Sequence, residues 1–239
     1  MPVGTPDRAH LQSAPSRHRI CRLHRQIVPY YRGAARHPKT VLPMLTVHLR
    51  DINTGVVRAW EQAFGDAPEV VVSCGDIFGQ KADAIVSPAN SFGHMDGGID
   101  LLYSKFFGWE LETNLRAVLS ERHYGELPVG QAVVLATGHE FIPFLVSAPT
   151  MRVPMRIGET VNVYLAFRAA LIAVLAHNAD AGVPIHSLLV PGLGTGIGEV
   201  APDRAARQMR HAYNAIINGE GVKRRNARSI LSEHRELAG

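Results

Sequence analysis

Short apolar runs that alternate with helical segments are the feature that most limits the fold of this chain. Residues 70–72, 84–86 and 187–190 are such runs, typical of strands that are covered on both faces of a sheet. The predicted strands are residues 45–49, 70–72, 84–86, 131–136, 141–147 and 187–190. The predicted helices are residues 53–64, 99–107, 111–124, 160–180 and 202–217. Strands separated by helices predict an α/β layered domain.

Two of the predicted strands lead into glycine-rich loops. Residues 87–100 read SPANSFGHMDGGID, and residues 191–198 read PGLGTGIG. Backbone N–H groups in such turns, and at the start of the helix that follows, can converge on an anion. Because an α/β sheet binds ligands outside the carboxyl ends of its strands, the two loops are expected to form one phosphate cradle. This pattern points to a nucleotide or pyrophosphate ligand.

Several other chemistries lack their sequence signatures. The loops contain no Gly-Lys-Ser/Thr, so they are not a P-loop and do not imply magnesium or nucleoside triphosphate hydrolysis. A Gly-x-Ser-x-Gly nucleophile turn is also absent from the sequence, and the histidines do not have the spacing of metal ligands. The sequence therefore predicts no metal and no cofactor.

A third segment, Gly75-Asp76-Ile77, completes a set that resembles the macro domain, an ADP-ribose-binding family. The resemblance runs over about residues 70–218 and rests on this turn and on the two glycine-rich loops. It implies a three-layer α/β/α fold with a mixed central sheet. It also implies that the ligand or partner is ADP-ribose or an ADP-ribosylated macromolecule.

The resemblance assigns ligand contacts residue by residue. Asp76 would accept a hydrogen bond from the adenine amino group, although an Asp at a strand end is otherwise a common turn or cap residue. Asn90 would face the distal ribose, because an amide can donate to and accept from sugar hydroxyls; the alternative is that Asn90 only closes its own loop. The other implied ligand-binding residues are Ile77, Gly97, Gly98, Ile99, Gly194, Thr195, Gly196, Ile197 and Gly198.

The two implied catalytic residues are Asn90 and Asp100. Asp100 matches the acid that follows the glycine loop in de-ADP-ribosylating macro domains, where it would position a water or orient the ribose. An Asp at a helix start can equally be a residue that complements the helix dipole. The chain also departs from the family pattern. Ser87 and Pro88 replace the usual Asn and Ala, and Gly97 stands where one branch carries a lysine, which disfavours a covalent mechanism through lysine.

The distribution of charge and cysteine limits the setting of the protein. Residues 1–43 carry eight Lys and Arg against one acidic residue, which leaves 17 basic and 20 acidic residues in 44–239. Direct nucleic-acid binding by the folded part is therefore not expected, except through an ADP-ribosylated target. Two cysteines give no disulfide framework, and Cys74 is expected to be buried. Uninterrupted apolar runs of membrane-spanning length are absent, so a cytoplasmic protein without membrane contact is predicted.

The chain divides into three predicted parts. Residues 1–43 are basic and low in apolar periodicity, and are predicted to be a disordered extension. The strand that opens at Met44 leads to the hypothesis that Met44 is the true start. Residues 44–218 form the macro-like domain. Residues 219–239 are a tail with a short surface helix from Ser229.

Three functional hypotheses follow. The first is an enzyme that binds ADP-ribose and hydrolyses an ADP-ribosyl bond on a protein, a nucleic acid or O-acetyl-ADP-ribose. The second is a non-catalytic reader of ADP-ribose, which needs the same cradle without a working acid. The third is a structural module of a larger, phage-type assembly, which predicts no dependence on a nucleotide. Fold resemblance does not decide among them.

Overall fold

A six-stranded sheet forms the centre of the domain. The computed structural model describes residues 45–180, 182–223 and 226–239, so the predicted extension over residues 1–43 lies outside the described residues. The strands are β1 (Thr46–Asp51), β2 (Val70–Cys74), β3 (Ala84–Ser87), β4 (Val133–Ala136), β5 (Phe144–Ser147) and β6 (Ser187–Val190). They lie in the order β2-β1-β6-β3-β5-β4, and only the β4–β5 pair is antiparallel. The sheet is therefore mixed.

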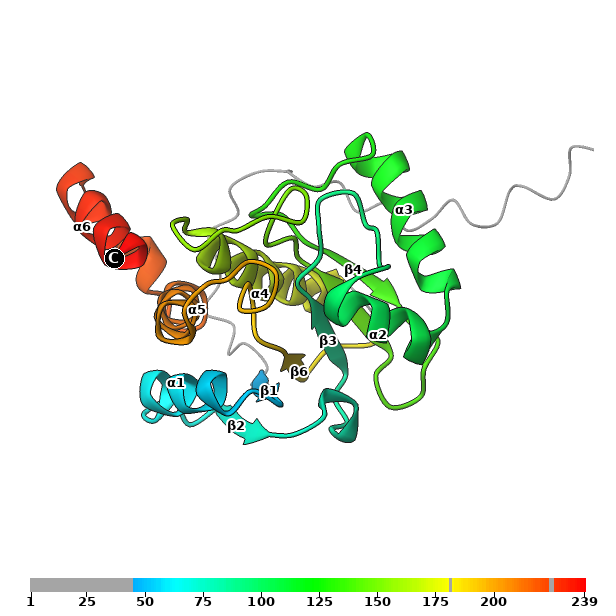
Figure 1. The fold of residues 1–239 in the computed structure, drawn as a ribbon, viewed down its shortest axis with the longest axis horizontal. Coiled ribbons are helices and arrows are strands. Elements are labelled where there is room, and N and C mark those ends of the chain that lie inside the picture. The colour runs from blue at the N-terminus through cyan, green and yellow to red at the C-terminus, as the bar shows by residue number, and fades with distance from the viewer. Residues whose placement is uncertain (1–44, 181, 224–225) are drawn as a thin grey trace, which may run out of the picture. The chain divides into compact units, whose positions relative to one another are not determined.

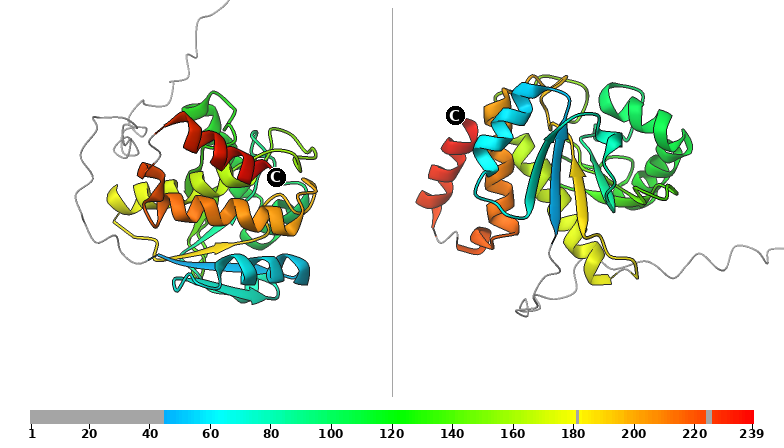
Figure 2. Two further views of the ribbon diagram at one scale, coloured as in Figure 1. Left: turned by 90° about the vertical axis from the view of Figure 1, so that its left-hand side faces the viewer. Right: turned by 90° about the horizontal axis from the view of Figure 1, so that it is seen from below.

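Helices cover both faces of this sheet. They are α1 (Thr54–Phe64), α2 (Gly98–Phe107), α3 (Glu110–His123), α4 (Asn162–Asp180), α5 (Pro202–Ile216) and α6 (Ala227–Ala238), with 3-10 turns η1 (Ile77–Gly79) and η2 (Glu220–Lys223) (Figure 1). Figure 2, right, shows α1, α5 and α6 on one side of the strands and α2 and α3 on the other. The predicted three-layer α/β/α architecture is confirmed.

Two hydrophobic cores lie between these layers. One holds Trp60, Phe167 and Met209 from α1, α4 and α5, together with the residues of the strands that face them. The other holds Tyr103 and Leu115 from α2 and α3. Successive residues of β3 alternate between the two cores because side chains of a strand point to opposite faces. This double burial explains the uninterrupted apolar run at residues 84–86.

The prediction of double burial was wrong for β2. This strand forms an edge of the sheet, and Val71 has an exposed fraction of 45%. Cys74, at the end of the same strand, is also exposed rather than buried. An apolar run alone does not distinguish an edge strand from a central one, because the distinction depends on which strands pair with it.

The connections after β3 and β6 leave on opposite faces of the sheet. These strands are parallel neighbours, and β3 leads to α2 in one outer layer while β6 leads to α5 in the other (Figure 2). Diverging connections of this kind leave a crevice at the carboxyl ends of the two strands. Both glycine-rich loops begin at this crevice.

The helix α4 is a core helix. It is long and apolar enough, by length and composition, to cross a membrane. Its buried residues, which include Phe167, Leu171 and Val174, belong to the core between the sheet and α5. Packing inside the domain therefore accounts for its apolar character.

The C-terminal helix α6 is fastened to α5. Leu237 is buried in the core that contains Met209. The fully buried Gln208 of α5 donates to the Leu237 carbonyl at 2.9 Å and to the Thr160 carbonyl at 2.8 Å. One buried amide therefore links α5 both to α6 and to the segment before α4.

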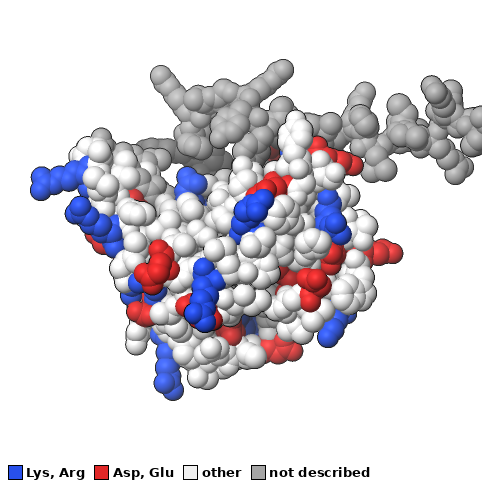
Figure 3. Space-filling view, turned by 45° about the horizontal axis from the view of Figure 1, so that its top comes forward, with Lys and Arg blue, Asp and Glu red and all other residues white. Residues whose placement is uncertain are grey.

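Charged side chains of both signs are interspersed on the surface drawn in Figure 3. Ion pairs also join segments distant in sequence, as between Arg152 and Glu126 at 2.8 Å and between Arg156 and Glu199 at 3.0 Å. Pairs of this exposed kind contribute little to stability.

Asn53 caps the first helix, and its removal gives a local test of the fold. Its side chain accepts the Gly55 N–H at 2.9 Å. Asn53→Ala is expected to lower the free energy of unfolding by about 1 kcal/mol, because one donor of the first turn loses its partner. Urea unfolding would measure the change. Asn218→Ala removes an exposed amide after α5 and is the control, with an expected change below about 0.5 kcal/mol. Equal effects of the two substitutions would contradict the capping role.

Candidate functional site

The two glycine-rich loops meet at the crevice between β3 and β6. Residues 88–97 (loop 1) join β3 to α2, and residues 191–198 (loop 2) follow β6. A Cβ added to Gly98 would lie 3.9 Å from Cδ1 of Ile197. The structure therefore brings together the loops that the sequence analysis paired, and we call the space between residues 96–99 and 193–198 the cradle.

The residues that border this cradle have unpaired backbone N–H groups. Those of residues 96–99 and 193–198 donate no hydrogen bond to any part of the chain that the structure describes. Residues 98 and 99 begin α2, so their N–H groups also lie at the positive end of the helix dipole. Clustered free donors of this kind suit an anion such as a phosphate.

Two glycines of loop 2 are needed for the shape of the loop itself. Gly194 has φ +71°, and an added Cβ would lie 3.0 Å from Val163 and Val200. A Cβ on Gly198 would lie 2.5 Å from the Gly194 carbonyl oxygen. Side chains at these positions would therefore force the loop to move.

Two other glycines leave the cradle open. A Cβ added to Gly97 or to Gly196 would meet no atom within 4 Å, and both residues are exposed. Neither backbone lies in the left-handed region. Larger residues would fit the free protein at both positions. The fold therefore does not require glycine at either position, and glycine instead leaves the space beside the loops open.

The other cradle residues differ in their surroundings. Ile99 packs against the core beneath α2 and α3, whereas Ile197 has an exposed fraction of 54%. Thr195 is half-buried, and its hydroxyl has no hydrogen bond within the described part of the chain. The Thr195 hydroxyl is therefore available as a further donor beside the N–H groups.

Asp100 lies beneath loop 1, in the first turn of α2. Its exposed fraction is 7%, and the Ser87 hydroxyl at the end of β3 donates to its Oδ1 at 2.6 Å. Burial raises the pKa of Asp100 to about 7, although the hydrogen bond from Ser87 opposes this change. Asp100 makes no capping hydrogen bond. The serine that departs from the family pattern is thus the partner of the implied catalytic acid.

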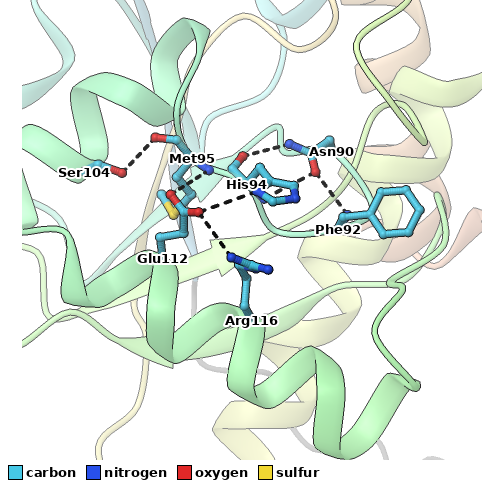
Figure 4. Close-up of polar contacts among 7 residues, drawn as sticks. All are labelled: Asn90, Phe92, His94, Met95, Ser104, Glu112 and Arg116. Carbon is cyan, nitrogen blue, oxygen red and sulfur yellow. Dashed lines mark hydrogen bonds and ion pairs between the residues drawn. The ribbon is translucent and has the colours of Figure 1, made fainter.

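Asn90 closes its own loop in this structure. Its Oδ1 accepts the N–H groups of Phe92 at 3.0 Å and His94 at 3.3 Å, and its Nδ2 donates to the His94 carbonyl at 2.7 Å (Figure 4). These contacts correspond to the alternative given in the sequence analysis, in which the Asn90 side chain closes its own loop. The carboxamide retains one N–H beyond the three hydrogen bonds.

Asp76 and Ile77 have mainly local roles. The Asp76 carboxylate accepts the Phe78 N–H at 3.1 Å and so caps η1, while Arg50 donates to its carbonyl at 2.8 Å. The Asp76 side chain remains exposed, whereas Ile77 has an exposed fraction of 6% and belongs to a core. Ile77 therefore supports the turn from below and offers little surface to a ligand.

Residues 151–157 form a third wall that the sequence analysis missed. Met151 pairs with Asn90 in a parallel bridge, and the Ile157 N–H donates to the Gly198 carbonyl at 2.9 Å. This segment therefore joins both loops, with Val153 and Met155 exposed along it. It carries no glycine or acid pattern that could have indicated its position.

Asp51 is a second residue that the sequence analysis missed. Its Oδ2 accepts the Gly192 N–H at 3.0 Å, and its Oδ1 accepts the Asn53 N–H at 2.8 Å. The carboxylate at the end of β1 therefore fixes the start of loop 2. Its place two residues after a predicted strand was the available signal. No group of three or more His, Cys, Asp or Glu side chains suited to a metal ion occurs in residues 45–180, 182–223 and 226–239.

Comparison with known proteins agrees with this architecture. A sequence model described as Macro domain matches residues 86–209, which include both loops. An uncharacterized protein of Aquifex aeolicus is 35% identical over 141 residues, or 59% of this chain and 78% of the relative. Among solved structures, the macrodomain of Mycobacterium tuberculosis DarG has a TM-score of 0.51 at 21% identity and covers 60% of this chain and 88% of its own. The structure of Thermosipho africanus DarTG in complex with ADP-ribose has a TM-score of 0.48 at 17% identity. The match covers 59% of this chain and 37% of the DarTG chain. The chain belongs to the Macro domain family.

Proposed function

We propose that this macro domain binds ADP-ribose in the cradle. The observation that carries the proposal is that residues 96–99 and 193–198, whose N–H groups are unpaired in the described part of the chain, lie next to each other at one crevice. Neutral backbone donors suit the pyrophosphate, because they stabilise its charge without holding it as tightly as paired cations would. The distal ribose would then lie near Asn90, whose remaining amide N–H is available to a sugar hydroxyl.

We further propose that the domain hydrolyses an ADP-ribosyl bond. The support is Asp100, a carboxyl group two residues beyond Gly98 whose pKa is raised to about 7 by burial. A group with such a pKa exchanges a proton readily at neutral pH, as a general base or acid must. In this proposal, water attacks the anomeric carbon of the distal ribose and Asp100 takes its proton. The bond from that carbon to the carrier breaks, and the carrier leaves with the electron pair, as a carboxylate where the carrier is an acidic side chain.

Release of free ADP-ribose tests the hydrolase proposal. The substrate is a protein mono-ADP-ribosylated on acidic side chains, and the enzyme is the full chain. Asp100→Asn is expected to lower turnover at least about a hundredfold, because the amide cannot accept a proton. Asp203→Asn is the matched control, since Asp203 occupies the first turn of α5 but is exposed there. Equal turnover by the wild type and Asp100→Asn would contradict the role of Asp100.

A non-catalytic reader of ADP-ribose is the second candidate. Two observations favour it, namely the hydrogen bonds that commit the Asn90 carboxamide to loop 1 and the exposed fraction of only 7% at Asp100. A reader would bind ADP-ribose in calorimetry yet release none from acidic side chains or from the other carriers named above. Absence of binding would contradict both candidates.

A further inference from the structure

The backbone on both sides of the Met95 Cα is held by side chains from two helices. Its N–H donates to Oε2 of Glu112 in α3 at 3.2 Å, and its carbonyl accepts the Ser104 hydroxyl of α2 at 2.9 Å (Figure 4). The Met95 side chain and Ser104 are both fully buried. Loop 1 is therefore fixed at Met95, one residue before the free N–H groups of the cradle begin.

Glu112 is the only carboxylate that reaches loop 1 from α3 among the described residues. Its side chain has an exposed fraction of 18%, so the carboxylate is largely withdrawn from water. Its Oε1 lies 3.6 Å from Nδ1 of His94 and 3.9 Å from Nη1 of Arg116. These two longer contacts are to exposed groups and are weaker than the hydrogen bond to Met95.

We infer that Glu112 is a positioning residue for ADP-ribose binding, because its hydrogen bond to the Met95 N–H orients the free N–H groups of residues 96–99 toward the cradle. The inference rests on the proposed function. The geometry of the chain gives the physical reason. The Met95 carbonyl and the Asp96 N–H belong to one planar peptide, which Ser104 holds, and Glu112 holds the peptide on the other side of Met95. The two contacts together limit φ and ψ of Met95, so the loss of Glu112 would let the direction of the Asp96 N–H vary. Glu112 itself touches no part of the cradle that would contact the ligand.

A purely structural role makes a different prediction. If Glu112 only attached α3 to the domain, its loss would lower the melting temperature and leave the affinity of the folded protein unchanged. A positioning role changes the affinity at a temperature where every variant is folded. It also predicts rescue by glutamine, because the glutamine side-chain oxygen can accept the same N–H.

The test compares Glu112→Ala, Glu112→Gln and the exposed control Glu121→Ala, which lies on the same helix. Calorimetric titration with ADP-ribose measures Kd, and hydrogen exchange of the unliganded proteins measures protection of the Met95 N–H. Glu112→Ala is expected to raise Kd about tenfold and to speed exchange of the Met95 N–H. Glu112→Gln and Glu121→Ala are expected to remain within about twofold of the wild type.

An unchanged Kd in Glu112→Ala would overturn the inference, as would a Glu112→Gln variant that binds as weakly as Glu112→Ala. Failure of the wild type to bind ADP-ribose would instead contradict the proposed function. In that case the exchange measurement still reports whether Glu112 orders loop 1, since it needs no ligand. Unchanged exchange would then overturn the inference separately.

Discussion

Replacing Gly196 with leucine is expected to weaken ADP-ribose binding by about a hundredfold without destabilising the fold. Gly196 is exposed in loop 2, and a Cβ added there would meet no atom within 4 Å. The leucine side chain would therefore fit the free protein and occupy the space assigned to the pyrophosphate. Calorimetric titration measures the affinity, and thermal unfolding measures the stability.

Gly182→Leu is the matched control for this substitution. Gly182 is exposed, also has open space around its Cβ position, and precedes β6, at the end of that strand opposite to loop 2. The affinity of the Gly182→Leu variant for ADP-ribose and its melting temperature are both expected to match those of the wild type. If Gly196→Leu bound ADP-ribose as tightly as Gly182→Leu, the ligand could not lie against loop 2.

Asp100→Asn is expected to stabilise the protein at pH 8 by about 4 kcal/mol while it removes turnover. Burial raises the pKa of the Asp100 carboxyl to about 7 in the folded protein, against 3.8 for an exposed aspartate. The folded state therefore binds a proton more tightly than the unfolded state does. An asparagine of similar shape carries no charge to bury and can still accept the Ser87 hydroxyl. Gain of stability with loss of activity is a common result at catalytic positions.

The sign of this effect gives it a distinct pH dependence. Below about pH 4 the carboxyl is protonated in both states, so wild type and Asp100→Asn should have similar stability. Between about pH 4 and pH 7 the unfolded state loses its proton first, and the wild type is destabilised relative to the variant as the pH rises. Above about pH 7 the difference should stay constant. Urea unfolding from pH 4 to pH 8 measures it, and a difference that does not change with pH would contradict the burial of an ionisable Asp100.

The order of helices and strands could be predicted from the sequence because its local signals agree with the fold. Residues 187–190 were predicted as a strand with the bounds of β6, and residues 53–64 match α1 with Asn53 as its cap. Strand starts were less accurate. Residues 141–147 were predicted as one strand, whereas β5 begins at Phe144. The Phe141 side chain is exposed, and Lys81 lies over its ring. Apolar character alone could not reveal that contact.

The candidate site could be predicted only where it has a local pattern. The positions of the glycines indicated both loops. Glycine is needed where the backbone must approach other atoms closely, and where the space beside the backbone must stay open. Glu112 and the wall of residues 151–157 act through contacts between segments distant in sequence, and neither has a pattern of its own. Asn90 and Asp100 were recognised by position. The partners of Asn90 lie in its own loop, whereas the partner of Asp100 comes from the end of β3. The Ser87 hydroxyl that faces Asp100 appeared in the sequence only as a departure from the family.

Titration of the isotopically labelled full chain with ADP-ribose, followed by amide NMR, tests the central claim most directly. The account predicts saturable shifts of the amide signals of residues 96–99 and 193–198, because their free N–H groups would donate to the pyrophosphate. The Gly182 amide, before β6, should not move. Absence of saturable shifts, or shifts confined to residues outside both loops, would contradict ADP-ribose binding in the cradle.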